Sequence, residues 1–171
     1  DKLGQVTQKD YLDYHIEQIL KVPYVNVEAI KAKKFKVVVD AVNSVGGIAA
    51  PKLLRALGVE VIHELYCEPT GKFAHNPEPL PENLSALSSE VKQQKADLGI
   101  AVDPDVDRLA LIDEKGIPFG EEYTLVAVAD YILKHKKGNT VSNLSSSKAL
   151  RDISIKHGVE YTASAVGEVN V

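Results

Sequence analysis

Several kinds of residue are scarce in this 171-residue chain, and each scarcity argues against a class of protein. The one cysteine, Cys67, has no partner for an internal disulfide and fits a reducing compartment, so we expect a cytoplasmic location. No apolar run approaches the ~18 residues of a membrane span and no leader pattern is present, so we expect neither a membrane segment nor a signal peptide. A net charge of −4 argues against nonspecific nucleic-acid binding.

Methionine is absent too, and the chain begins at Asp1. Because translation starts at methionine, we expect the sequence to be a piece of a longer protein. The ending at Ser164–Val171, without a helix or a tail, supports the same expectation. The rest of the composition, 44% hydrophobic and 26% charged residues, is ordinary for one globular domain or slightly more.

Short apolar runs alternate with segments of helical periodicity, which predicts an α/β fold built in layers. The predicted helices cover residues 10–20, 25–33, 48–57, 81–95 and 121–137. The predicted strands cover residues 37–40, 59–62, 98–102 and 109–112. Asp10 is a candidate N-cap, Pro23 ends the first helix, and Gly58 is suited to the C-terminal cap of the third.

A boundary is predicted at Lys136–Asn139, where charged residues and a glycine follow the last long helix. The next segments are typical of a strand (140–144), a helix (147–157) and a strand (159–161), which is how a second α/β unit would begin. We therefore predict one domain over residues 1–137 and the start of another over residues 138–171.

Three other segments could suggest chemistry, but structural interpretations are favoured. Asn43–Gly47 matches neither glycine-rich phosphate-binding pattern, so a structural turn is predicted. Tyr66–Pro81 is a proline-rich irregular loop whose His75 is expected to be a hydrogen-bonding surface residue. Ser145–Ser147 has no His–Asp pair placed to activate a serine, so a helix cap is predicted there.

The strongest chemical pattern is Asp103-Pro104-Asp105-Val106-Asp107-Arg108, which lies between two buried strands. Alternation places the carboxylates of Asp103, Asp105 and Asp107 on one side of an extended or curled segment. Two like charges about 4 Å apart repel by roughly 1 kcal/mol in water and roughly 4 kcal/mol near a protein surface. Three hard oxygen ligands suit Mg²⁺ or Ca²⁺, so the pattern favours a metal site over a polar hairpin tip.

Other kinds of site also use closely spaced carboxylates. An EF-hand would place Glu114 at its twelfth position, but it requires glycine where Arg108 stands and helices where strands are predicted. A haloacid-dehalogenase-type phosphatase would use Asp103 as nucleophile and Asp105 as acid, and it remains the enzymatic alternative. A stand-alone Mg²⁺- or phosphate-binding module of the receiver type is the non-enzymatic alternative, although alternating Asp residues followed by Arg fit it poorly.

The order of motifs resembles the α-D-phosphohexomutase superfamily, the phosphoglucomutases and phosphomannomutases. Its metal loop is commonly Asp-Gly-Asp-Gly/Ala-Asp-Arg, and here Pro104 and Val106 replace the small residues. Further similar segments are Val37–Asp40 with Asn43 and Gly46-Gly47, Leu57–Val61, Phe73–Leu84, Asp97–Ala101, Asp113–Gly116 and Ala165–Glu168. The resemblance implies a layered mixed sheet flanked by helices, with residues 1–137 as the metal-binding second domain and residues 138–171 as the truncated start of the third.

The resemblance also implies a reaction. Family members move a phosphoryl group between C1 and C6 of a hexose phosphate (glucose or mannose 1- or 6-phosphate) through a phosphoserine and a bisphosphate intermediate. By this likeness Asp103, Asp105 and Asp107 would hold Mg²⁺, and Arg108 would contact the phosphoryl group. The phosphoserine loop has no match here, so we expect the chain to depend on the remaining domains of the same protein and to be inactive alone.

Overall fold

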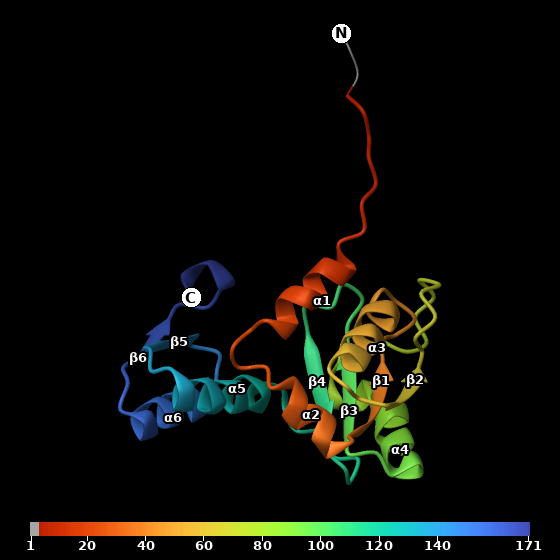
Figure 1. The fold of residues 1–171 in the computed structure, drawn as a ribbon. Helices are drawn as coiled ribbons and strands as arrows, with labels where there is room; N and C mark the ends of the chain where they lie inside the picture. Colours follow the sequence, from red (N-terminus) through yellow and green to blue (C-terminus); the bar gives the residue numbers. More distant parts are fainter. Residues whose placement is uncertain (1–3) are drawn as a thin grey trace.

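The computed structural model describes residues 4–171, and it contains six α-helices, six strands and two 3₁₀ helices within that range. Residues 4–11, which precede the first helix, extend away from the rest of the molecule (Figure 1). In chain order the elements are α1 (Leu12–Leu20), α2 (Val27–Lys33), β1 (Lys36–Asp40), α3 (Gly46–Ala56), β2 (Val61–Leu65), η1 (Pro81–Asn83), α4 (Ser85–Gln94), β3 (Leu98–Val102), β4 (Leu109–Ile112), α5 (Glu121–His135), β5 (Thr140–Asn143), α6 (Ala149–His157), β6 (Tyr161–Ser164) and η2 (Glu168–Asn170).

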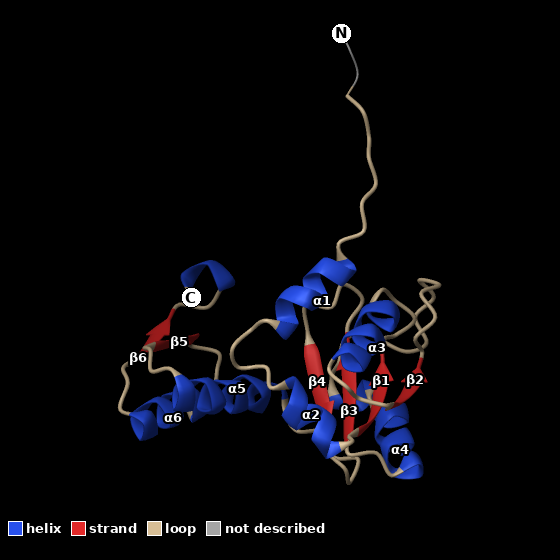
Figure 2. Cartoon of the chain, viewed as in Figure 1, coloured by secondary structure: helices blue, strands red, loops and turns tan. Residues whose placement is uncertain are grey.

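Strands β1 to β4 form one mixed sheet in the order β2-β1-β3-β4. β1 pairs in parallel with both β2 and β3, while β4 runs antiparallel to β3. β5 and β6 form a separate parallel pair. The expected layered mixed sheet flanked by helices is confirmed, as Figure 2 shows with strands in red between helices in blue.

The central strand β1 packs against helices on both of its faces. Because successive side chains point to opposite faces, Val38 joins one apolar cluster and Val37 and Val39 join another. The Val38 cluster contains Leu87 of α4, whereas the second cluster is flanked by residues of α2 and α3. Burial on both faces explains the continuous apolar run of β1. The strand is therefore a rigid support for the loop that begins after Asp40.

Two strand predictions begin two residues too early, and both errors have the same cause. Gly58 and Gly158 adopt left-handed φ angles of 87° and 67° at the ends of α3 and α6. The next residues, Val59 and Val159, donate their backbone N–H to Leu54 and Ser154, which completes a C-terminal capping motif at each helix. β2 and β6 therefore start at Val61 and Tyr161 rather than at residues 59 and 159. The predicted cap at Gly58 is confirmed.

Other boundaries also differ from prediction. The helix expected over 81–95 is divided into η1 and α4, with the buried Leu84 between them at φ −101°. α3 begins at Gly46, so its glycine pair is already helical rather than part of the predicted turn. α6 begins at Ala149, whose N–H donates to Ser147 Oγ at 3.3 Å. Asp10 likewise accepts from the N–H of Leu12 at the start of α1, which is assigned one residue later than a cap at Asp10 would give.

The C-terminal elements pack mainly on one another. α5 lies beside α6, and it also contacts β4 at the edge of the four-stranded sheet (Figure 1). Asp130 of α5 accepts from Lys156 at 2.9 Å and His157 at 2.8 Å, both near the end of α6. Within residues 4–171 none of the helices has the length and apolar character needed to cross a bilayer.

Candidate functional site

The candidate site lies where three parallel strands end at the same edge of the sheet. β1 ends at Asp40, β2 at Leu65 and β3 at Val102, so the loops after these strands converge. The carboxyl edge of a parallel sheet is where such folds usually bind ligands. The loop 103–108 then returns through β4, with Val102 paired to Leu109 at its base.

The structure brings together the three carboxylates that the sequence pointed to. One oxygen from each of Asp103, Asp105 and Asp107 lies within 4.8 Å of the others. Asp103 is buried, while Asp105 and Asp107 are exposed. The N–H of Val106 donates to the carbonyl of Asp103 at 3.2 Å, which closes a tight turn and curls the loop around the carboxylates.

Val106 adopts a φ of 65°, in the left-handed region that is unusual for a β-branched residue. The Val106 side chain lies against Gly46, where there is no room for a side chain. A Cβ built at Gly46 would be 3.4 Å from Val106 Cγ2 and 2.5 Å from Val102 Cγ2. Ser44 Oγ donates to the carbonyl of Pro104 at 2.5 Å. The turn before α3 is thus a support for the acidic loop, which extends the structural role predicted for it.

Arg108 is held by the first carboxylate of the loop. Its backbone N–H donates to Asp103 Oδ1 at 3.1 Å and its Nε–H donates to Asp103 Oδ2 at 2.8 Å. Burial alone would raise the pKa of Asp103, but these hydrogen bonds outweigh burial and lower it. Asp103 therefore stays ionised at neutral pH although its side chain is only 1% exposed.

For Asp107 the effects that raise the pKa are the larger ones. Its hydrogen bond with Asp103, partial desolvation and repulsion from Asp105 and Asp103 raise its pKa, and Arg108 offsets only part of this. Arg108 Nε lies 3.6 Å from Asp107 Oδ1, so one guanidinium is shared between two carboxylates. The loop therefore carries more negative charge than its own cation compensates, and a divalent cation would relieve that excess.

His75 has a more specific contact than a surface residue would make. Its Nε2 lies 2.9 Å from Oδ2 of Asp40, whose side chain is 1% exposed, and its Nδ1 lies 2.7 Å from the carbonyl of Asn76. The ring is 19% exposed. Asp40 also accepts from the N–H of Val42 at 3.0 Å. The histidine forms hydrogen bonds as expected, but it does so by fixing the 66–80 loop to the end of β1.

Sequence reasoning missed one residue at this edge, Glu78. Its Oε1 lies 3.2 Å from Nη1 of Arg108, 30 residues later in the chain. The Pro-Glu-Pro segment carried the family likeness, but nothing in its spacing indicated which side chain Glu78 would meet. This contact joins the proline-rich loop to the acidic loop.

The remaining candidates lie apart from the acidic loop or lack the reactivity a site would need. Burial, with help from Glu64 and Asp40, raises the pKa of Cys67 to about 11, so its nucleophilic thiolate is scarce at neutral pH. Ser145 and Ser146 hydrogen-bond Asn143 beside α6.

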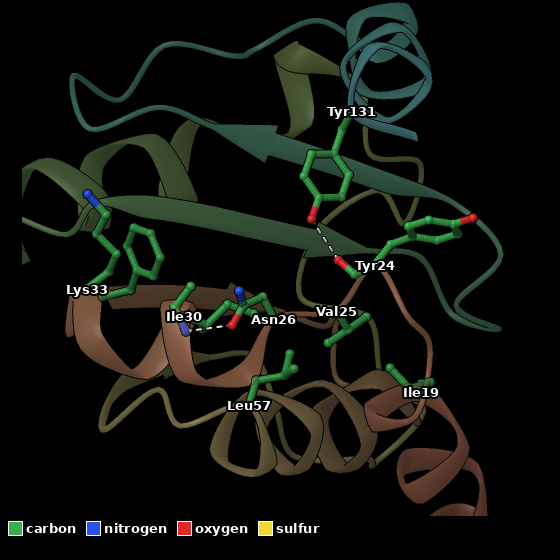
Figure 3. A pocket seen from close by; sticks show the side chains of 10 residues that line it. Ile19, Tyr24, Val25, Asn26, Ile30, Lys33, Leu57 and Tyr131 are labelled. Atoms are coloured by element: carbon green, nitrogen blue, oxygen red, sulfur yellow. Dashed lines mark hydrogen bonds between the residues drawn. The ribbon is translucent and has the colours of Figure 1, made fainter. Parts of the chain in front are cut away.

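A surface pocket of about 490 Å³ is apolar and contains none of the predicted site residues. Figure 3 shows this pocket, where Tyr131 Oη donates to the carbonyl of Tyr24.

Comparison with known proteins adds independent information about the whole arrangement. Residues 10–116 match the family model described as phosphoglucomutase/phosphomannomutase, alpha/beta/alpha domain II. A phosphoglucomutase/phosphomannomutase of Thermococcus kodakarensis is 37% identical over 173 residues, which cover 100% of this chain and 37% of that protein. A phosphomannomutase/phosphoglucomutase of Pseudomonas putida is 34% identical over 91% of this chain and 33% of its own length. The chain thus spans about a third of the length of these curated relatives.

Solved structures share the fold. A putative phosphomannomutase from Thermus thermophilus superposes with a TM-score of 0.85 over 96% of this chain and 38% of that chain, at 23% identity. A phosphoglucomutase/phosphomannomutase family protein from Burkholderia thailandensis superposes with a TM-score of 0.80 at 30% identity, over 94% of this chain and 34% of its own. The strand order and the helix layers described above are therefore those of known protein structures.

Proposed function

The chain belongs to the phosphoglucomutase/phosphomannomutase family, and on that premise we propose that it supplies the Mg²⁺-binding loop of a phosphohexomutase. The whole enzyme would transfer a phosphoryl group between C1 and C6 of a glucose or mannose phosphate, through a phosphoserine and a bisphosphate intermediate. The observation that carries the proposal is the convergence of three carboxylate oxygens within 4.8 Å at the carboxyl edge of the sheet.

The donor set suits Mg²⁺. All three side chains offer hard oxygen atoms, and Mg²⁺ typically takes few carboxylates together with water or phosphate oxygens. Asp103, Asp105 and Asp107 would hold the ion, with the buried Asp103 fixed by Arg108 and the other two carboxylates exposed. When bound, Mg²⁺ would supply positive charge to neutralise the charge that develops on the transferred group.

Arg108 would contact the phosphoryl group beside this loop. Its side chain is 46% exposed although Asp103 and Glu78 each accept a hydrogen bond from the guanidinium. A planar guanidinium has donors left over after two such bonds, and its fork matches phosphate geometry. The role proposed for Arg108 is to bind and orient the phosphoryl oxygens.

The metal site can be tested by titrating the chain with Mg²⁺ and following backbone amides by NMR. We expect shifts confined to residues 103–108 and weak binding. Asp105→Asn should weaken binding by about tenfold or more, because it removes one charged ligand of three. Glu114→Gln is the matched control, since it makes the same charge change at an exposed position in the turn after β4, at the other end of that strand from the acidic loop, and should leave the affinity unchanged. Equal affinity for both variants would contradict the assignment of the ligands.

The reaction itself requires the longer protein. We propose that the 171-residue chain has no mutase activity alone, because it spans about a third of its relatives and contains no segment resembling the phosphoserine loop. A coupled assay with glucose 1-phosphate or mannose 1-phosphate should show turnover by the full-length protein and none by this chain. Turnover by the chain itself would contradict the proposal that it is inactive alone.

We also propose that residues 1–137 and 138–171 belong to different domains of that enzyme. In support, the four-stranded sheet falls entirely in the first range and the β5–β6 pair entirely in the second. α5 is the last helix of the first range, and it packs against α6, which belongs to the second range.

A further inference from the structure

The guanidinium of Arg108 is held from two sides by residues of different loops. Nε donates to Asp103 Oδ2 at 2.8 Å, and Nη1 donates to Glu78 Oε1 at 3.2 Å. Among the residues that the structure describes, none accepts a hydrogen bond from Nη2. A hydrogen bond at Nε alone would leave the guanidinium plane free to turn about the line of that bond. A second hydrogen bond at Nη1 fixes the plane and with it the direction of Nη2.

We propose that Glu78 is a positioning residue that orients Arg108 so that Nη2 remains available as a donor to a phosphoryl oxygen. The inference rests on the function proposed above for Arg108, but the orientation of the side chain can be measured separately. Glu78 is 52% exposed, so its pair with Arg108 contributes little to folding stability and its main effect is geometric.

Glu78 can serve this purpose because its own backbone is fixed. Its N–H donates to Asn76 Oδ1 at 3.2 Å, and its carbonyl accepts from Asn83 Nδ2 at 2.9 Å. Three residues earlier, His75 anchors the same loop to the buried Asp40. A carboxylate on such a loop has a defined position relative to β1, and β1 pairs directly with β3, which leads into the acidic loop.

The chain offers a simple spectroscopic test, because it contains only three arginines, Arg55, Arg108 and Arg151. In ¹⁵N-labelled protein we would measure hydrogen exchange and heteronuclear NOE values at the Nε–Hε group of each. Glu78→Ala should accelerate exchange at Arg108 by about two- to fivefold, the range expected for loss of an exposed ion pair, and should lower its NOE. Arg55 and Arg151 should not change.

Two further variants distinguish orientation from a general charge effect. Glu78→Gln retains an acceptor oxygen and should give an intermediate exchange rate. Glu82→Ala removes an exposed carboxylate from the same segment and should behave like wild type. An Arg108 signal that Glu78→Ala leaves unchanged would overturn the proposal, because the carboxylates of the acidic loop would then fix the guanidinium without Glu78.

In the full-length protein, Glu78→Ala should lower the mutase kcat while Glu82→Ala leaves it unchanged. If Glu78→Ala releases Arg108 in the NMR experiment but wild-type protein shows no mutase activity, the proposed function fails and the positioning of Arg108 stands. If mutase activity is present and equal in both variants, the positioning role in phosphoryl binding is wrong while the proposed function stands.

Discussion

Gly47→Ala is expected to destabilise the protein by about 3 kcal/mol, the upper part of the usual range for overpacking. A Cβ at this position would lie 2.2 Å from the carbonyl oxygen of Cys67 and 2.7 Å from its Cα. These are backbone atoms, so no side-chain rotation can relieve the contact. Either α3 or the loop after β2 must move, and Asn43 N–H, which donates to the Tyr66 carbonyl at 2.6 Å, would move with it.

The matched control is Gly138→Ala. Nothing lies within 4 Å of a Cβ built at Gly138, so the substitution should change stability by less than about 1 kcal/mol, and towards greater stability. Urea unfolding followed by far-UV circular dichroism measures both variants. A Gly47→Ala protein as stable as wild type would mean that the loop after β2 does not rest on α3 as tightly as the structure has it.

The sequence predicted those features that depend on local pattern. β1 and β3 lie where continuous apolar runs placed them, because strands buried on both faces need such runs. Asp103, Asp105 and Asp107 converge as expected, because a short connection between paired strands must curl. The family likeness, which rested on the order of several weak motifs, is shown by the family model and the relatives.

The features that the sequence did not predict depend on contacts between distant segments. Glu78 meets Arg108 and His75 meets Asp40 across 30 and 35 residues, through a loop that has no periodic pattern from which its path could be inferred. The late starts of β2 and β6 arise because Val59 and Val159 complete helix caps, a use of the N–H group that β propensity does not reveal.

Asp103→Asn is expected to destabilise the protein by about 2 kcal/mol or more, although the two side chains have nearly the same shape. Asp103 accepts from the Arg108 N–H at one oxygen and from Arg108 Nε–H at the other. An asparagine has one acceptor oxygen, so its amide NH₂ must face a donor. Losing a hydrogen bond between charged groups costs about 1.5–3 kcal/mol, and an unsatisfied buried group about 1–3 kcal/mol. Relief of repulsion from the neighbouring carboxylates returns roughly 1 kcal/mol.

Asp105→Asn separates this effect from loss of charge in general. It removes a carboxylate from the same loop at an exposed position, so stability should change by less than about 0.5 kcal/mol or rise slightly as repulsion falls.

The stabilisation by Asp103 should also depend on pH. Because the folded-state pKa of Asp103 lies below its ordinary value of 3.8, the contribution of this carboxylate to stability is present above that value and is lost as the pH falls further. Unfolding free energies of wild type and Asp103→Asn should therefore differ most near neutral pH and converge below pH 3.8. A constant difference across that range would show that Asp103 acts through its shape rather than its charge. The Arg108 contact would then be a consequence of the fold rather than one of its supports.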